Sequence, residues 1–249
     1  MSAKPLHSSD VSFFCTATRD WRKLASRIFV VQWAGWRRFL RDFVVIQIGF
    51  FFFGLSIDIV VQAGIGTAPW VVLEKGLTNH ISLSLGQANL LVAFLIILFD
   101  VILKEPLGWG SVSNMLFVGL WVDLLRPFVP AVPPIMWIQV LYLLLGALVM
   151  GFATAVYVGV NAGAGPRDSL MLAISRMARV SLRGARTILE TSVVVIGWLL
   201  GGPVWLGTVI FALAIGPSVQ LAFRLLRINP PKWNGARPTG HESRGLSVC

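Results

Sequence analysis

The sequence predicts an all-α polytopic membrane protein built from two tandem repeats. Of its 249 residues, 56% are apolar and 13% are charged, and the charged fraction is about half that of a soluble domain. Apolar runs long enough to cross a hydrocarbon core of about 30 Å recur along the chain. Two of these runs are interrupted by stretches rich in Gly and Pro, at 64–69 and 161–169. So many long apolar runs exceed what the core of a soluble protein requires.

The two interruptions stand at equivalent places of an internal repeat. Pro166 lies 97 residues after Pro69, and the same shift places Gly163 on Gly66. Further pairs match without a gap: Gly49 with Gly146, Gly54 with Gly151, Pro106 with Pro203, Gly110 with Gly207, and Gly119 with Gly216. Because Gly and Pro dictate the shape of the backbone, these matches indicate a duplication over residues 43–128 and 140–225.

In the first repeat we expect membrane spans at 43–62, 87–103 and 110–125. A short helix is expected between the first two spans, from Pro69 to Asn79, because Pro suits the first helical turn and Thr67 is a candidate cap. A helix of this length reaches about 20 Å, which is too short to cross the membrane alone. Lys104 to Gly110 forms a turn.

The second repeat is expected to follow the same plan. Its spans are predicted at 135–160, 187–200 and 204–223, with a short helix from Pro166 to Ala178 and a basic connection at 176–186. A Pro-rich connector, 129–139, joins the repeats. Residues 1–42 form a basic cytoplasmic tail, in which 27–41 is either an interfacial helix or an extension of the first span. Residues 226–249 form a cytoplasmic tail without fixed structure.

The number of spans depends on the two short helices. If they dip into the membrane without crossing it, each repeat has three spans and the two repeats are inverted, for six spans in total. If they cross, the protein has eight spans and parallel repeats. The short length favours six. In both cases the positive-inside rule places the N-terminus, the 176–186 segment and the C-terminus in the cytoplasm.

The net charge of +10 does not indicate a nucleic-acid partner. Eight of the 21 Lys and Arg residues precede residue 42, five lie at 167–186 and five at 224–244. Basic clusters that flank apolar spans orient a membrane protein. The expected partner is therefore the lipid bilayer and not nucleic acid. The oligomeric state stays open, a homo-oligomer included.

No signature of an enzyme, cofactor site or metal site is found. The chain has no G-x-S-x-G, H-E-x-x-H or P-loop motif. Its Cys and His residues are scattered and lack the spacing of metal ligands; they are Cys15, Cys249, His7, His80 and His241. We therefore expect no enzyme, no cofactor and no metal.

Ionisable residues within apolar spans are costly and usually face a cavity or a partner. Asp58, Glu74 and Glu190 are candidates of this kind. Asp100 and Asp123 lie near predicted span ends, where headgroup water can hydrate them.

The two helix breaks predict a substrate site. Its candidate residues are Gly64, Gly66, Thr67, Pro69, Gly163, Gly165, Pro166, Arg167 and Asp168. Broken helices at equivalent places of two repeats mark the central site of many transporters, and two helix N-termini beside Arg167 favour an anion. Arg167 is expected to pair with Asp58, Glu190 or the ligand, and these two acids are candidates for ion or proton coupling. The alternative is a snorkelling Arg167, a capping Asp168 and glycines that serve only packing.

Several segments resemble a known family. They are Gly-x-Gly-x-x-Pro-Trp at 64–70, Gly-Ala-Gly-Pro-Arg-Asp-Ser-Leu-Met at 163–171, and the segments 190–202 and 207–217. Over residues 43–225 the chain resembles the YczE-like branch of the YczE/YyaS/YitT bacterial integral membrane proteins. The resemblance implies the bacterial inner membrane, and a transport or export-supporting role, without an established activity.

The sequence therefore favours a small secondary transporter or permease for a small molecule, an anion being one candidate class. The alternative is a membrane scaffold or accessory subunit that supports export without transporting. An integral-membrane enzyme ranks third.

Overall fold

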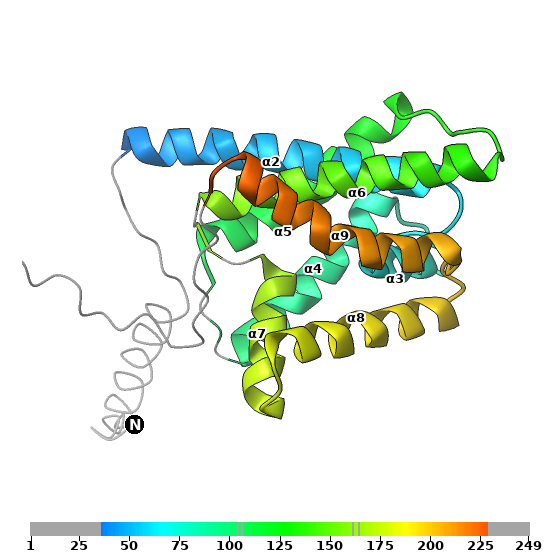
Figure 1. The fold of residues 1–249 in the computed structure, drawn as a ribbon. Coiled ribbons are helices and arrows are strands. Elements are labelled where there is room, and N and C mark those ends of the chain that lie inside the picture. The colour runs from blue at the N-terminus through cyan, green and yellow to red at the C-terminus, as the bar shows by residue number, and fades with distance from the viewer. Residues whose placement is uncertain (1–35, 104, 106, 161, 164, 229–249) are drawn as a thin grey trace, which may run out of the picture.

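The computed structural model describes residues 36–103, 105, 107–160, 162–163 and 165–228, and these form helices joined by short connections (Figure 1). The helices are α2 (Trp36–Gln62), α3 (Pro69–Thr78), α4 (Leu85–Ile102), α5 (Trp109–Leu125), the 3-10 turn η1 (Arg126–Phe128), α6 (Met136–Gly159), α7 (Pro166–Ala178), α8 (Leu182–Leu199) and α9 (Leu206–Leu225). Residues 1–35 and 229–249 of the tails expected at the termini, together with Lys104 and Asn161, lie outside the described residues. The described part is all-helical, as the sequence predicts.

Four helices are long and apolar enough to cross a membrane: α2, α4, α6 and α9. The remaining two long helices are shorter or more polar, since α5 has 17 residues and α8 carries Arg183, Arg186 and Glu190. Large apolar side chains face outward along these helices, among them Phe99, Leu120 and Leu213. Such a surface is suited to lipid.

The starts of α2 and α5 and the ends of α6 and α9 share one end of the molecule, which we call the first end. The ring of Phe39 in α2 lies 5.1 Å from the ring of Trp109 in α5. Gly159 at the end of α6 faces Ile228, which follows α9.

The second end holds the end of α2, the start of α4 and the end of α5. The side-chain amide of Gln62 donates to the carbonyl of Val129 at 3.0 Å. The hydroxyl of Ser84 donates to the carboxylate of Asp123 at 2.5 Å.

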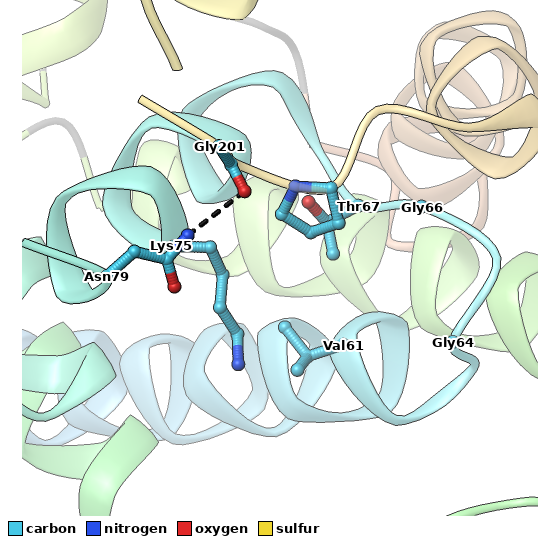
Figure 2. Close-up of a pocket in the computed structure, with 8 residues that line it drawn as sticks. Val61, Gly64, Gly66, Thr67, Lys75, Asn79 and Gly201 are labelled. Atoms are coloured by element: carbon cyan, nitrogen blue, oxygen red, sulfur yellow. Dashed lines mark hydrogen bonds between the residues drawn. The ribbon is translucent and has the colours of Figure 1, made fainter. Parts of the chain in front are cut away.

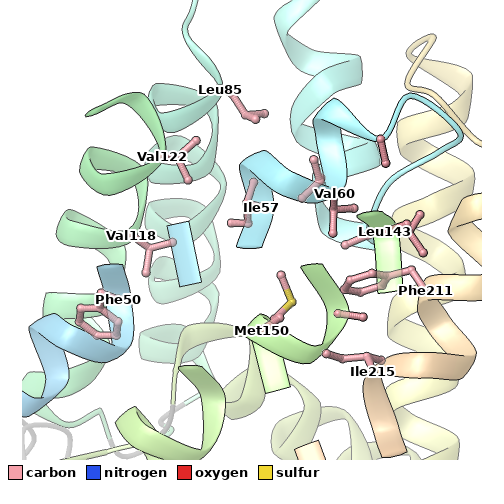
Figure 3. Close-up of a cluster of buried hydrophobic side chains, with 14 of the residues drawn as sticks. Phe50, Ile57, Val60, Leu85, Val118, Val122, Leu143, Met150, Phe211 and Ile215 are labelled. Atoms are coloured by element: carbon pink, nitrogen blue, oxygen red, sulfur yellow. The ribbon is translucent and has the colours of Figure 1, made fainter. Parts of the chain in front are cut away.

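The central pair of helices, α2 and α6, run in opposite directions side by side, as the colours in Figure 1 show. Their contact forms the core together with α5 and α9 (Figure 3). Four of the glycines that match between the two repeats let neighbouring helices approach closely, because a Cβ at each would lie 2.6–3.0 Å from an atom of another helix. Gly49 faces Tyr157, Gly54 faces Trp121, Gly146 faces Val60 and Gly151 faces Ser218.

One backbone hydrogen bond fastens each helix break to the start of a helix in the other half of the chain. The N–H of Gly207 in α9 donates to the carbonyl of Ile65 at 2.7 Å, and the N–H of Gly110 in α5 donates to the carbonyl of Ala162 at 3.1 Å. Gly207 lies 97 residues after Gly110, and Ala162 lies 97 residues after Ile65. The two bonds therefore join the same positions of the proposed repeat, with the halves exchanged.

At helix starts the structure corrects two expectations and decides between two alternatives. Helix α8 begins at Leu182 and not at 187, because Ser181 accepts a capping hydrogen bond from the N–H of Gly184. Helix α2 begins at Trp36, so residues 36–41 extend the first span. Thr67 does not cap α3, whose N-cap is Ala68, without a side-chain bond.

The expectation for Asp100 was wrong. Its side chain is fully buried and neither carboxylate oxygen has a hydrogen-bond partner among the described residues. Asp123 is half-buried, and it accepts hydrogen bonds from Ser84 and from the backbone N–H of Gly86 at 2.9 Å.

Candidate functional site

The starts of the two short helices meet at one cavity, which we call the central cavity. It has a volume of about 170 Å³, and both Pro69 and Pro166 line it. Trp70 and Arg167, the residues that follow these prolines, line it as well. The prolines fix the first turn of each helix, so the breaks deliver the two helix starts to the same space.

Arg167 joins the two short helices through an ion pair. Its guanidinium lies 2.5 Å from a carboxylate oxygen of Glu74 in α3. The side-chain amide of Asn89 in α4 donates to the same oxygen at 2.8 Å. The side chain of Glu74 is fully buried, while that of Arg167 is 24% exposed. A buried carboxylate requires such partners, because an unpaired charge in the interior is strongly unfavourable.

The guanidinium of Arg167 also lies over the ring of Trp70, 4.9 Å from its centroid, which is within the range of a cation–π interaction. Trp70 and Arg167 are 97 residues apart. The contact therefore joins one position of the proposed repeat with its own counterpart.

Asp168 accepts a hydrogen bond from the hydroxyl of Tyr157 in α6, at 3.0 Å. Both residues line the central cavity. The N-cap of α7, Gly165, has no side-chain capping bond. Asp168 is thus bound to α6 through Tyr157, in addition to its favourable place in the first turn of α7.

The wall formed by α8 contributes a second arginine. Arg186 and Glu190 line the cavity one helical turn apart, with 2.8 Å between the guanidinium and the carboxylate. Arg167 therefore pairs with Glu74 and not with the expected Glu190 or Asp58.

The lining of the central cavity contains two arginines and two carboxylates, with Glu74 behind them. Both arginines already have carboxylate partners, so the surplus of positive charge that the sequence predicted is absent from this set of residues. An anionic ligand would have to compete with Glu74 or Glu190 for its arginine.

The first helix break leads to a separate cavity (Figure 2), which we call the second cavity. Its volume is about 250 Å³. Three residues of the first break line it, namely Gly64, Gly66 and Thr67, and the other lining residues are Val61, Lys75, Asn79, Gly201 and Pro203. The backbone N–H of Thr67 donates to the hydroxyl of Thr208 at 3.2 Å. The expected site residues of the first break are thus divided, because only Pro69 reaches the central cavity.

Gly66 and Gly163 have structural roles. Their φ angles are 116° and 119°, which disfavour any other residue. A side chain would also collide, with Thr208 at Gly66 and with Gly108 at Gly163. Gly163 lines neither cavity.

Asp58 also lines neither cavity, and it is buried within α2 at 1% exposure. One of its carboxylate oxygens has no hydrogen-bond partner in the described part of the chain.

Sequence reasoning did not assign Glu74, Tyr157 and Arg186 to this site. Glu74 stands one helical turn after Trp70, so the spacing places the two on one face of α3. Tyr157 and Arg186 carry no such local signal, since their contacts depend on how α6 and α8 pack.

Comparison with known proteins identifies the family. Residues 40–224 match the model of a family of unknown function, DUF6198. An uncharacterized protein of Haemophilus influenzae is 36% identical over 70% of this chain and 79% of its own length. The uncharacterized membrane protein YczE of Bacillus subtilis is 30% identical over 66% of this chain and 76% of its own.

A third relative, the uncharacterized protein YyaS of Bacillus subtilis, is 26% identical over 66% of this chain and 83% of its own. No solved structure matches. With its apolar helices and these relatives, the chain is a multi-pass membrane protein that belongs to the DUF6198 family of YczE-like proteins.

Proposed function

We propose that the protein is a small secondary transporter of the bacterial cytoplasmic membrane, and that its substrate binds in the central cavity. One observation carries the proposal: two broken helices start at one cavity, beside ionisable side chains that are costly within a membrane. Transporters with inverted repeats place their sites at such breaks. A buried ion pair such as that of Arg167 and Glu74 is no more stabilising than well-packed apolar side chains, so its presence at this position favours a functional role.

The proposed transporter consists of two inverted repeats. The exchanged hydrogen bonds of Gly110 and Gly207 support this arrangement, because a two-fold axis relates such pairs. Equivalent packing contacts support it too, since Gly54 faces Trp121 and Gly151 faces Ser218, each 97 residues further on. The opposite directions of α2 and α6 agree with inversion.

Six spans follow if both short helices return to the end from which they entered. At the second end, Gly66 faces Thr208 near the start of α9, and Asn79 after α3 donates to the carbonyl of Gly201 after α8, at 3.0 Å. At the first end, Gly163 faces Gly108 before α5, and Arg176 of α7 forms an ion pair with Glu105 after α4. These contacts favour re-entrant helices over crossing ones.

The first end faces the cytoplasm in this proposal, with both termini on that side. Arg176, Arg179 and Arg186 lie near the start of α8, and Arg224 lies in the last turn of α9. The second end carries Arg126. This distribution agrees with the positive-inside rule.

The proposed substrate is a small molecule with an anionic group that takes over an arginine of the cavity. Glu190 fits a coupling role, because protonation of its carboxylate would free Arg186 for the ligand. Protonation of the Glu74 carboxylate would free Arg167 in the same way. Asp58 fits this role less well, since it lines neither cavity.

A ligand screen tests the proposal. The purified protein in detergent is heated with a library of organic anions, and a binder raises the melting temperature through mass action. We expect the double variant Arg167→Gln/Glu74→Gln to lose the response, and Arg224→Gln on the exposed end of α9 to keep it. A hit is then tested for uptake into proteoliposomes. Binders that stabilise the double variant as well as the wild type would contradict the site.

A further inference from the structure

The two halves differ in one respect that bears on the central cavity. In the first half, α4 is closed onto α5. Asp123 accepts hydrogen bonds from Ser84 and from the N–H of Gly86, at 2.5 and 2.9 Å. The backbones of Gly86 and Gly119 are in direct contact, since a Cβ on either would collide with the carbonyl of the other. These contacts close the α4–α5 pair at the second end.

In the second half, the equivalent helices α8 and α9 are not in contact at these positions. Helix α8 packs on α3 and α7 but forms no comparable contact with α9. Gly216, the counterpart of Gly119, has no atom of another helix within 4 Å of where its Cβ would lie. Ser181 and Gln220, the counterparts of Ser84 and Asp123, are both exposed.

The space between α8 and α9 is part of the central cavity. Leu189 and Glu190 line it from α8, and Ile215 and Val219 line it from α9. Gly216 falls on the same face of α9 as these two residues, by helical spacing. Three of the counterparts of these four lining residues in α4 and α5 are buried and do not line the cavity; they are Val92, Ala93 and Val122. The fourth, Val118, is buried and lines the cavity, as its counterpart Ile215 does.

We propose that these two helix pairs are alternating gates of the central cavity, with the α8–α9 gate open and the α4–α5 gate closed in this structure. In the other state the halves exchange their arrangements. Helix α8 then packs on α9 across Gly216, and α4 separates from α5. The gates stand at opposite ends, so the exchange moves access to the cavity from the first end to the second. The inference rests on the proposed transport function and on the inverted repeat.

Helix α9 is built to make this movement. Pro217 follows Gly216 in the middle of the helix, and a proline there removes a backbone hydrogen bond and allows a bend. A glycine beside it lets a neighbouring helix approach closely. In the first half the same two positions are Gly119 and Leu120.

Disulfide formation tests the gates without knowledge of the substrate. In a Cys15→Ser/Cys249→Ser background, the pair Ser181→Cys/Gln220→Cys is reconstituted in proteoliposomes, oxidised, and followed by the loss of free thiols. Ser84→Cys/Asp123→Cys is the positive control. Ser181→Cys/Leu225→Cys is the negative control, because Leu225 is 71% exposed on another face of α9.

Two single substitutions test whether the gates are coupled. Asp123→Ala removes the bonds that close α4 onto α5, so it should speed disulfide formation between 181 and 220 about tenfold by raising the population of the other state. Asp42→Ala, which removes a partner of the exposed Arg41, should leave the rate unchanged. Gly216→Leu should slow the reaction about tenfold without lowering the melting temperature, because its side chain has room only while the gate is open.

The gate proposal is wrong if the 181/220 pair fails to react while the positive control reacts, or if Asp123→Ala leaves its rate unchanged. Ligand binding is measured separately, through the loss of response in Arg167→Gln/Glu74→Gln. A failed gate with intact binding removes only this inference. Coupled gates without any ligand response would remove the proposed binding site and keep the conformational change.

Discussion

The contact between Arg167 and Glu74 determines what the site can do. Glu74 has no exposed surface, and its charge depends on Arg167 and Asn89. The pair joins residues 93 positions apart and fixes the start of α7 against α3. Arg167 is therefore a structural residue and a candidate ligand contact at the same time. A loss of function in a single Arg167 variant would not separate these roles.

A pair of variants does separate them. Arg167→Gln leaves Glu74 without its counter-charge, so we expect a loss of about 3 kcal/mol in stability, as for other broken buried pairs. Arg167→Gln/Glu74→Gln removes both charges and should recover most of that loss. The melting temperature in detergent measures both effects, with Arg224→Gln as a surface control. Equal destabilisation by the single and the double variant would show that the ion pair does not hold α7 in place.

Sequence reasoning found the helix breaks, Arg167 and Asp168, because Gly and Pro followed by charged residues are rare within apolar runs. It missed Glu74 as the partner of Arg167, since side chains 93 positions apart meet only through packing. It also placed Gly64, Gly66 and Thr67 in the same site as Pro69. The structure assigns those three to the second cavity, while Pro69 lines the central cavity.

At the scale of elements, the short helices were predicted well and α8 was not. Pro69 and Pro166 mark the first turns of α3 and α7 unambiguously. The basic residues of 176–186 resembled a connection, but Arg183 and Arg186 occupy the first two turns of α8. The cap at Ser181 was the signal for this earlier start, and these two arginines obscured it.

The position of α3 depends on two glycines that let it approach α8. A Cβ at Gly197 of α8 would lie 2.6 Å from the backbone nitrogen of Leu73, and one at Gly76 of α3 would lie 2.7 Å from the carbonyl oxygen of Gly197. We expect Gly197→Leu to separate the helices and cost about 1–3 kcal/mol, as overpacking does. Gly216→Leu is the matched control, since it adds the same side chain where the structure has open space. Thermal unfolding of both variants gives the comparison, and equal melting temperatures would contradict this account of how α3 is held.

At the scale of the whole molecule, the sequence left six or eight spans open. The charges alone could not decide, because both topologies place the 176–186 cluster and the C-terminus in the cytoplasm. Tertiary contacts add what the charges lack. They place the two ends of each short helix relative to the other helices, which a linear pattern of hydrophobicity cannot do.

One labelling experiment distinguishes the two topologies. In the six-span arrangement η1 lies outside the cell and the end of α7 lies inside, because each short helix returns to its own end. In the eight-span arrangement both lie inside. Phe128 in η1 is 78% exposed and Arg179 after α7 is exposed, so a cysteine at either position is accessible to a reagent on its own side. We expect a membrane-impermeant maleimide to label Phe128→Cys in intact cells, and to label Arg179→Cys only after the cells are opened, both in the Cys15→Ser/Cys249→Ser background. If neither residue is labelled until the cells are opened, the result would support eight spans. The two short helices would then cross the membrane, and the two-fold relation on which the alternating gates depend would no longer hold.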